Sequence, residues 1–522
     1  MEAMLGCGTP VDKEHISKIE AELLPMWRTL PKNSHGRVER RTLRYLAHRH
    51  FMKKSSLLIR GFEPSRSVNH SHWGAADILS QQVPAYVESR LESTRALQHG
   101  FSLNDAAFMI VMLEKLIFDS ESTLLEQAYA AAHQSTSRSL GHKELSNVLE
   151  VYMVHWLMGD DQEGIQILMK NRTLLSQAFP HWKDLVGFAE GQLKTLEFAR
   201  RSGGHRDALT GEFSFDEAHA VVGAITKSFS SFWESECASM KSQLVDMDSL
   251  GNGRVKLSKF YGTGLDADWR FGESESYLRE LGALDETSRW MGKQVIIPNY
   301  MQAASNCIVS TPHYLVCCVN ECESLLGEIE EAIGASVALP SQILAIVGNM
   351  TSQTTLDDDE SPMLKGSLTS QLEDIGQKNG GVVPLHGRLF AQWLHYTFPR
   401  ECPFPHKMGT ASSSTPSEFG DAYLAQKEDM QRHAESDKEA HASFHDTEGE
   451  WMSQWSAEEE LISEYSGILH SPWEGRGYLM TLGMLALLLL GLYSGAVGIG
   501  SVVLKGKGAR CNDLWTSKSH LV

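Results

Sequence analysis

A cluster of cysteines in the middle of the chain is the clearest group of side chains that could do chemistry. The cluster comprises Cys307, Cys317, Cys318, Cys322 and, between them, His313. Structural zinc sites usually pair their ligands as CxxC, and the adjacent cysteines break that spacing. Disulfides, which an oxidising compartment would favour, reduced thiols and a metal site therefore all stay open. Cys237 and Cys402 are further candidate disulfide partners.

A second set of potential ligands follows a long amphipathic stretch. The segment from Leu244 to Tyr261 reads LVDMDSLGNGRVKLSKFY, with acidic and amide side chains before a glycine and a valine. Oxygen ligands at alternate positions and a glycine for a sharp turn are typical of calcium-binding loops. The segment therefore resembles an EF-hand calcium loop preceded by its entering helix.

Aligning this loop with its glycine at position 6 gives four candidate calcium ligands. They are the side chains of Asp248 and Asn252, the backbone carbonyl of Arg254 and, if the loop bulges, Asp246. Position 3 is an apolar leucine, and position 12 is Lys259 where the family has a bidentate glutamate. We therefore expect weak calcium binding at most, with a dissociation constant no tighter than about 10⁻⁴ M, and no other cofactor.

Two other segments repeat the order of a glycine turn, a valine and a helix. They span residues 33–51 and 379–398, and in each helix a histidine lies three residues before a phenylalanine. Neither segment has acidic residues at the loop positions. They are either degenerate relatives of the first loop or chance similarities.

No catalytic signature accompanies these groups. The sequence has no GxSxG, Walker loop, dinucleotide-binding glycine motif or HExxH in a suitable context. We therefore expect a non-catalytic interaction or calcium-responsive module. The alternative is a hydrolase-like enzyme that uses His386, His395 or the cysteine cluster. A deep pocket that joins these residues would favour the enzyme.

The stretch Tyr478–Leu504 is apolar and holds no charged residue. About 20 such residues cross a bilayer as a helix, so we expect a single-pass membrane protein whose partner is the lipid bilayer. Gly491 and Gly495 lie four residues apart, a spacing that lets two membrane helices approach closely and form a homodimer.

The side of the membrane on which the body lies stays open. The N-terminus has no apolar run and is not a secretory signal, which favours a cytosolic body inserted by its tail. The basic tail, the cysteines and the glycosylation sequons at Asn69, Asn171 and Asn349 favour the opposite side.

Charge is unevenly distributed along the chain, whose formal net charge is −19. Residues 28–66 hold eleven Lys and Arg against two Glu, with Trp27, Tyr45 and Phe51 nearby. This basic stretch is either a solvated helix face or a surface for anionic lipid or an acidic protein partner. The acidic remainder argues against general nucleic-acid binding.

The hydrophobic periodicity predicts a mainly α-helical body. Ser102 with Asp105 and Ser214 with Glu217 have the spacing of capping boxes, and the second box opens a long amphipathic helix. The expected order of parts is a flexible N-terminus (1–14), a helical domain (15–200), an EF-hand-like unit (205–265), a cysteine-containing α-rich domain with some mixed structure (266–406), a polar linker or stalk (407–476), a transmembrane helix (478–504) and a basic tail (505–522).

Three stretches of the chain carry a resemblance to a known family. They read RGFEPSRSVNHSHWGAADILSQQVPAYVESRLES, then IIPNYMQAASNC…YLVCCVNECESLLGEIE, then VPLHGRLFAQWLHYTFPRECPFPH. Together they resemble an uncharacterised family of membrane proteins from algal protists, dinoflagellate-like in character, over roughly residues 24–406. The resemblance implies an EF-hand-like segment and a membrane segment, and it assigns no catalytic residues.

Overall fold

The chain is mainly α-helical, which confirms this part of the predicted fold class. Seventeen α-helices fall within the part of the chain that the computed structural model describes. That part comprises residues 13–63, 99–159, 161–179, 181–202, 211–266, 270–287, 291–350, 364, 366–406 and 410–436. The predicted membrane span 478–504, with Gly491 and Gly495, and the basic tail lie outside it. Among the described helices, none is both long and apolar enough to cross a bilayer.

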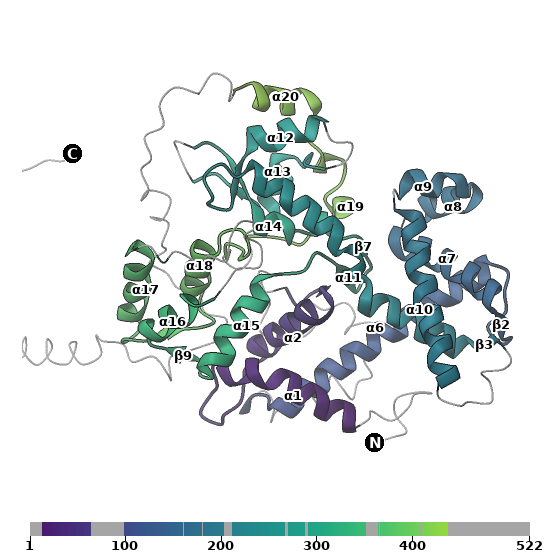
Figure 1. Cartoon of the computed structure of the whole chain (residues 1–522), viewed down its shortest axis with the longest axis horizontal. Coiled ribbons are helices and arrows are strands. Elements are labelled where there is room, and N and C mark those ends of the chain that lie inside the picture. The colour runs from purple at the N-terminus through teal and green to yellow at the C-terminus, as the bar shows by residue number, and fades with distance from the viewer. Residues whose placement is uncertain are drawn as a thin grey trace, which may run out of the picture.

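Most described elements follow one repeating order of helix, loop, short strand and helix. Antiparallel contacts between short strands, or in one case the isolated bridge between Val38 and Phe101, join the described repeats in twos, which gives four pairs. Figure 1 shows how their helices are arranged. The first pair contains α1 (Lys13–Thr29), α2 (Arg40–Ser55) and α6 (Leu103–Ala131), and its bridge joins Val38 to Phe101. The second contains α7 (His142–Met158), α10 (Trp182–Ser202) and α11 (Phe215–Met247), with β2 (Leu140–Gly141) bonded to β3 (Glu212–Phe213).

The third and fourth pairs use shorter helices. The third contains α12 (Leu257–Asp266), α13 (Glu275–Glu280) and α14 (Ile297–Met301), and β4 (Arg254–Lys256) bonds to β6 (Gln294–Ile296), which also bonds to β5 (Leu284–Asp285). The fourth contains α15 (Cys322–Ile333), α16 (Pro340–Val347), α17 (Gly366–Lys378) and α18 (Arg388–Thr397), with β9 (Val337–Ala338) bonded to β10 (Val383–Pro384).

Two helices belong to two pairs at once. Helix α6 ends the first pair and begins the second, and α11 ends the second and begins the third. Both begin at the predicted capping boxes, because Ser102 and Ser214 exchange hydrogen bonds with Asp105 and Glu217. Shared helices therefore join the first three pairs without an intervening linker.

The remaining elements fill the spaces between the pairs. A three-stranded sheet joins β1 (Leu57–Ile59), β8 (Tyr314–Val316) and β7 (Val309–Ser310). The shorter helices are α8 (Gln162–Lys170), η1 (Arg172–Leu174), α9 (Leu175–Ala178), η3 (Ala304–Asn306), α19 (Pro416–Phe419), η4 (Asp421–Tyr423) and α20 (Lys427–Ser436).

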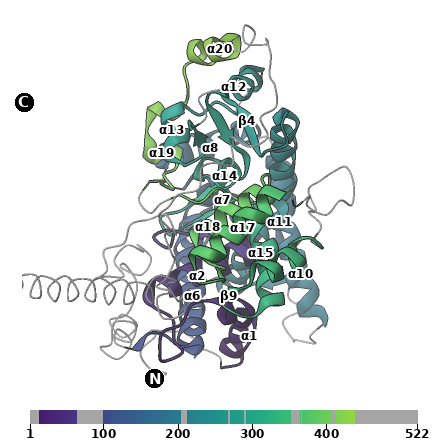
Figure 2. The ribbon, with the colours of Figure 1, turned by 90° about the vertical axis from the view of Figure 1, so that its left-hand side faces the viewer.

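Part of the predicted linker belongs to the body. Helix α20 packs against α12, and both views show the two helices side by side (Figures 1 and 2). Met430 on α20 is buried in the core of the third pair. Residues 410–436 therefore differ from the polar stalk that composition predicted, because their few apolar side chains cover this pair.

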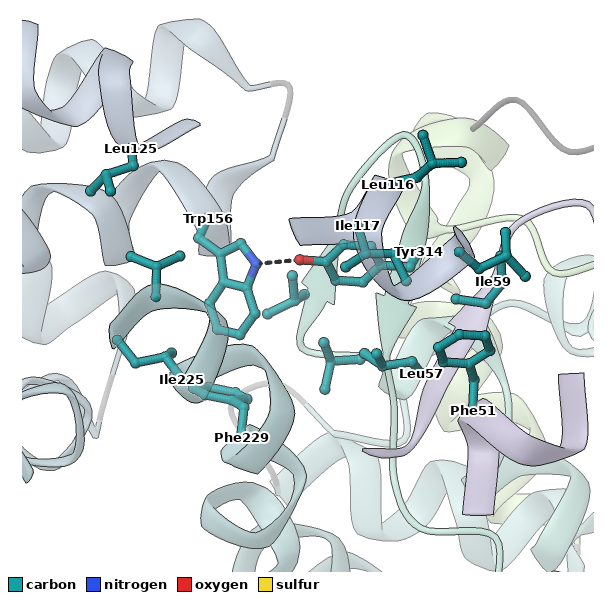
Figure 3. Packing of buried hydrophobic residues seen from close by; sticks show 14 of the residues in the cluster. Phe51, Leu57, Ile59, Leu116, Ile117, Leu125, Trp156, Ile225, Phe229 and Tyr314 are labelled. Carbon is teal, nitrogen blue, oxygen red and sulfur yellow. Dashed lines mark hydrogen bonds between the residues drawn. The ribbon is translucent and has the colours of Figure 1, made fainter. Parts of the chain in front are cut away.

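Three hydrophobic cores support the pairs, and the first pair and second pair share the largest one. In that core, shown in Figure 3, Trp156 Nε1 donates a hydrogen bond of 3.0 Å to Tyr314 Oη, which joins α7 to β8. Tyr314 in turn donates to Glu121 on α6 at 3.2 Å. The alternative of a solvated basic face is wrong for Arg44 and Arg49 of α2, which are buried, whereas Lys53 and Lys54 on the same helix are exposed.

Candidate functional site

The predicted calcium loop begins where α11 ends. Asp248 caps the helix, and its carboxylate oxygens accept hydrogen bonds from the backbone N–H groups of Asn252 at 3.2 Å and Gly253 at 3.0 Å. The side-chain oxygen of Asn252 accepts from the N–H of Arg254 at 3.2 Å. Asx-type bonds of this kind fold a loop back on its first residue. The loop therefore gathers Asp248 and Asn252, the two strongest candidate ligands, at one place.

A guanidinium occupies the position facing the Asp248 carboxylate. Arg400, which follows α18, donates from Nε to Oδ2 of Asp248 at 3.0 Å, and the Asp248 side chain is fully buried. The neighbouring carbonyl of Pro399 lies so near Gly253 that an added Cβ would be 1.8 Å from its oxygen. Gly253 also has φ +72°, a conformation that favours glycine. The loop is thus closed from outside by the segment Pro399–Arg400.

The other predicted loop residues do not converge on this carboxylate. Asp246 is exposed on the last turn of α11. Lys259 at position 12 is exposed, and its Nζ donates to the carbonyl of Met247 at 3.3 Å. Two cations, from Lys259 and Arg400, therefore lie where an EF-hand presents oxygen ligands.

The side chain of Arg254 has a structural partner. Its Nε donates to Asp285 at 2.8 Å, and both side chains are buried. Burial by itself would raise the pKa of Asp285, but the Arg254 charge and hydrogen bonds from Thr287 outweigh it and lower that pKa. This buried ion pair joins β4 to β5 within the third pair.

His395, a candidate base of the enzyme alternative, is held in the same network. Burial, reinforced by the Arg254 charge, lowers its pKa to about 3, so its ring is neutral near pH 7. Its Nε2 lies 3.0 Å from Nη1 of Arg254, and its Nδ1 lies 2.7 Å from the carbonyl oxygen of Cys402. Both ring nitrogens therefore have protein partners.

Six cysteines form three disulfides, and they include the whole predicted cluster. The bonds are Cys237–Cys318, Cys307–Cys317 and Cys322–Cys402. The first ties α11 to the segment after β8, and the third ties α15 to the segment that carries Arg400. Within the described residues, no group of three or more His, Cys, Asp or Glu is placed to hold a metal ion.

A cavity of about 370 Å³ lies where the first, third and fourth pairs meet, and its surface is mostly apolar although charged and polar residues such as Arg41, Glu63 and His406 also line it. This volume lies within the range of small-molecule sites. Residues of α2, α15 and α18 line it, together with residues of α14 and just after it, and residues of the segments 403–406 and 411–413. His386 and Cys322 are among them, whereas His395 is not. The cavity therefore joins only part of the group that the enzyme alternative requires.

A buried polar network supports one wall of this cavity. Arg49 pairs with Glu323 at 2.6 Å and with Glu330 at 2.5 Å, and His386 lies between Tyr45, at 3.3 Å, and Thr29, at 3.1 Å. Burial, and to a smaller degree the Arg49 charge, lowers the pKa of His386 to about 4 despite the opposing Glu330 charge. The imidazole is therefore neutral at physiological pH.

The network does not contain an activated nucleophile that can reach the cavity. The hydroxyl of Thr29 is fully buried and donates to the carbonyl of Met26 at 2.8 Å. Cys322 is bonded to Cys402 and so offers no thiolate. The contacts of this network join α1, α2 and α15.

The residues that sequence reasoning missed act across long distances in the chain. Arg400 lies 152 residues from Asp248, and Arg49 lies 274 residues from Glu323. The cysteine at position 402 was the one sequence feature near Arg400 that signalled a tertiary role.

The chain was compared with known families, proteins and structures. No family model, curated protein or solved structure matches the chain. The resemblance to the algal-protist family stays a prediction.

Proposed function

We propose that this protein is a membrane-anchored, non-catalytic interaction module whose body keeps its shape without calcium. The observation that carries the proposal is the Arg400 guanidinium on the Asp248 carboxylate. A protein cation is thereby placed where the resemblance predicts a calcium ion. The body would serve as a rigid scaffold rather than as a calcium sensor.

Several features support an EF-hand-like origin for the repeats. In the second, third and fourth pairs short strands lie between the described helices, and the third pair joins Val255, at loop position 8, to Val295 across an antiparallel contact. The first and fourth pairs contain the segments 33–51 and 379–398, in which the sequence repeats the glycine–valine–helix order. We therefore interpret all four pairs as degenerate relatives of one helix–loop–helix unit.

Electrostatics argues against a calcium ion at Asp248. A divalent ion about 4 Å from a guanidinium is repelled by roughly 8 kcal/mol at an effective dielectric of 20. Two side-chain ligands, from Asp248 and Asn252, cannot offset this, because strong sites supply a bidentate glutamate as well. Calcium binding would first require Arg400 to leave.

Calorimetric titration of the full chain with calcium tests the proposal. The unmodified protein should show no binding tighter than about 10⁻⁴ M. The double variant Arg400→Gln, Lys259→Glu should bind at least tenfold more tightly, and adding Asp248→Asn should abolish that gain. Arg432→Gln is the matched control, because Arg432 is an exposed arginine on α20. Micromolar binding by the unmodified protein would overturn the proposal.

Membrane anchoring is tested separately by fractionation. The full chain should sediment with membranes and resist carbonate extraction, whereas a chain ending at Trp473 should not sediment. Recovery of the full chain in the soluble fraction would remove the anchor from the proposal.

The cavity favours a second candidate function, the binding of a small, largely apolar ligand. A fluorescent apolar probe such as anilinonaphthalene sulfonate should bind the folded protein with one-to-one stoichiometry. Ala391→Trp, which fills the cavity from α18, should weaken this binding at least tenfold, and so should Ala411→Phe, at another lining residue. Equal binding by both folded variants would exclude the cavity as the site.

A further inference from the structure

We propose that the side-chain nitrogen of Asn171 carries an N-linked glycan. Asn171, Arg172 and Thr173 form one of the Asn-x-Ser/Thr acceptor sequences, and all three residues are exposed. The triplet lies between α8 and η1, where Asn171 ends the first helix. This inference goes beyond the interaction function and does not depend on calcium or on the cavity.

The local backbone already brings the two recognised side chains together. Asn171 has φ −134° and ψ 85°, so it lies outside the helix. Its side-chain oxygen accepts hydrogen bonds from the N–H of Thr173 at 3.3 Å and from the Thr173 hydroxyl at 2.6 Å. Arg172 is directed to α7, where it contacts Asn147 at 3.1 Å and Glu150 at 3.5 Å. The amide and the hydroxyl thus sit on one exposed turn.

The surroundings of the other two acceptor sequences differ from those of Asn171. Asn349 is exposed, but its nitrogen donates to the carbonyl of Ala345 at 2.9 Å in the last turn of α16. The next residue, Met350, is buried in the core of the fourth pair. Asn69 lies outside the described residues. Thr351, the third residue of the Asn349 acceptor sequence, also lies outside them, so residues 171–173 form the acceptor sequence whose three residues are all described, and all three are exposed.

The disulfides point independently to the compartment in which this modification occurs. Stable disulfides form in oxidising environments such as the secretory lumen and are rare where thiols are kept reduced. Six of the eight cysteines are bonded in the structure. N-glycosylation of Asn-x-Ser/Thr is a surface modification of proteins that pass through the secretory route. The three disulfides therefore support a body on the lumenal or extracellular side, the side on which N-glycosylation occurs.

The reaction is a group transfer without a change of oxidation state. A bond forms between Nδ2 of Asn171 and the first sugar carbon of an oligosaccharide carried on a polyprenyl diphosphate. The bond from that carbon to the diphosphate oxygen breaks, the lipid diphosphate leaves with the electron pair, and Nδ2 loses one proton.

Peptide mass spectrometry of the full chain, produced in eukaryotic secretory cells, tests the assignment. Enzymatic removal of N-glycans in heavy-oxygen water should convert Asn171 to labelled aspartate. Asn171→Gln should lower the apparent mass of the protein on a gel by the mass of one glycan, and Thr173→Ala should do the same. Thr173→Ser should keep the glycan, because it keeps the hydroxyl.

Two results would overturn the proposal. One is an unlabelled Asn171 peptide from protein whose six cysteines are oxidised. The other is protein with free thiols at these cysteines and no glycan, which would place the body in a reducing compartment.

Discussion

Replacing Glu121 by glutamine should make the stability of this protein less dependent on pH. Glu121 lies on α6 in the core that the first and second pairs share, and its side chain is 3% exposed. Burial raises its pKa from 4.5 to about 7, although a hydrogen bond from Tyr314 and the charge of Lys227 oppose the rise. The folded protein therefore holds a proton that the unfolded chain releases at lower pH.

The size of the effect follows from this difference in pKa. Because the folded-state pKa lies above the unfolded value, this group favours folding most below pH 4.5 and loses that contribution as the pH rises to about 7. A rise from 4.5 to about 7 corresponds to about 3 kcal/mol of unfolding free energy. Glutamine has nearly the same shape, carries no charge and can still accept from Tyr314.

Urea denaturation of the two proteins between pH 4.5 and pH 8 measures the effect. The stability of Glu121→Gln relative to the unmodified protein should increase by about 3 kcal/mol over this range. Glu126→Gln, on the exposed side of the same helix, is the control and should change by less than about 0.5 kcal/mol. A constant difference between the Glu121 variant and the unmodified protein at all pH values would show that Glu121 titrates normally, and the reasoning would fail.

Three further substitutions test other parts of the fold. Asp285→Asn leaves the buried Arg254 without its carboxylate and should cost about 3–5 kcal/mol at pH 7 by urea denaturation. Because the pKa of Asp285 is lowered, the cost should shrink below pH 4, and an unchanged cost at pH 3 would contradict this. Trp156→Phe removes the hydrogen bond to Tyr314 and should lower the unfolding free energy by about 1–3 kcal/mol. An unchanged urea midpoint would show that this hydrogen bond does not stabilise the fold. Gly253→Ala should displace the Pro399 carbonyl and so speed proteolysis of the 399–402 segment. Proteolysis at the same rate as in the unmodified protein would refute the close packing of Gly253 against Pro399.

The sequence predicted the local features of this fold well, because they depend on neighbouring residues. Both capping boxes and the long helix α11 are confirmed, since a hydroxyl and a carboxylate three residues apart satisfy helix N–H groups wherever they occur. The segments 33–51 and 379–398, chosen for a glycine turn and a valine, contain most of helix α2 and all of helix α18. The contacts of these segments with Phe101 and with β9 were not predicted, because pairing depends on residues distant in the chain.

Long-range pairings were not predictable from one sequence. Spacing alone leaves many disulfide connectivities open. The structure resolves them at Cys317 and Cys318, which follow β8 directly and bond to Cys307 and Cys237 respectively. Successive side chains of an extended segment point to opposite faces, so two adjacent cysteines reach different partners. The Arg400 contact at Asp248 likewise depends on how α18 docks, which no local pattern encodes.

The helix shared between the second and third pairs couples the orientations of these two pairs. Helix α11 contains 33 residues, so it is about 50 Å long at 1.5 Å per residue. Its first turn adjoins the β2–β3 contact, and its last turn holds the loop of Asp248. If α11 tilts by a few degrees about its C-terminal part, where Cys237 forms a disulfide, its N-terminal end is therefore displaced by several ångströms. The second and third pairs are therefore joined by one continuous helix, so a change in the orientation of one pair changes the orientation of the other.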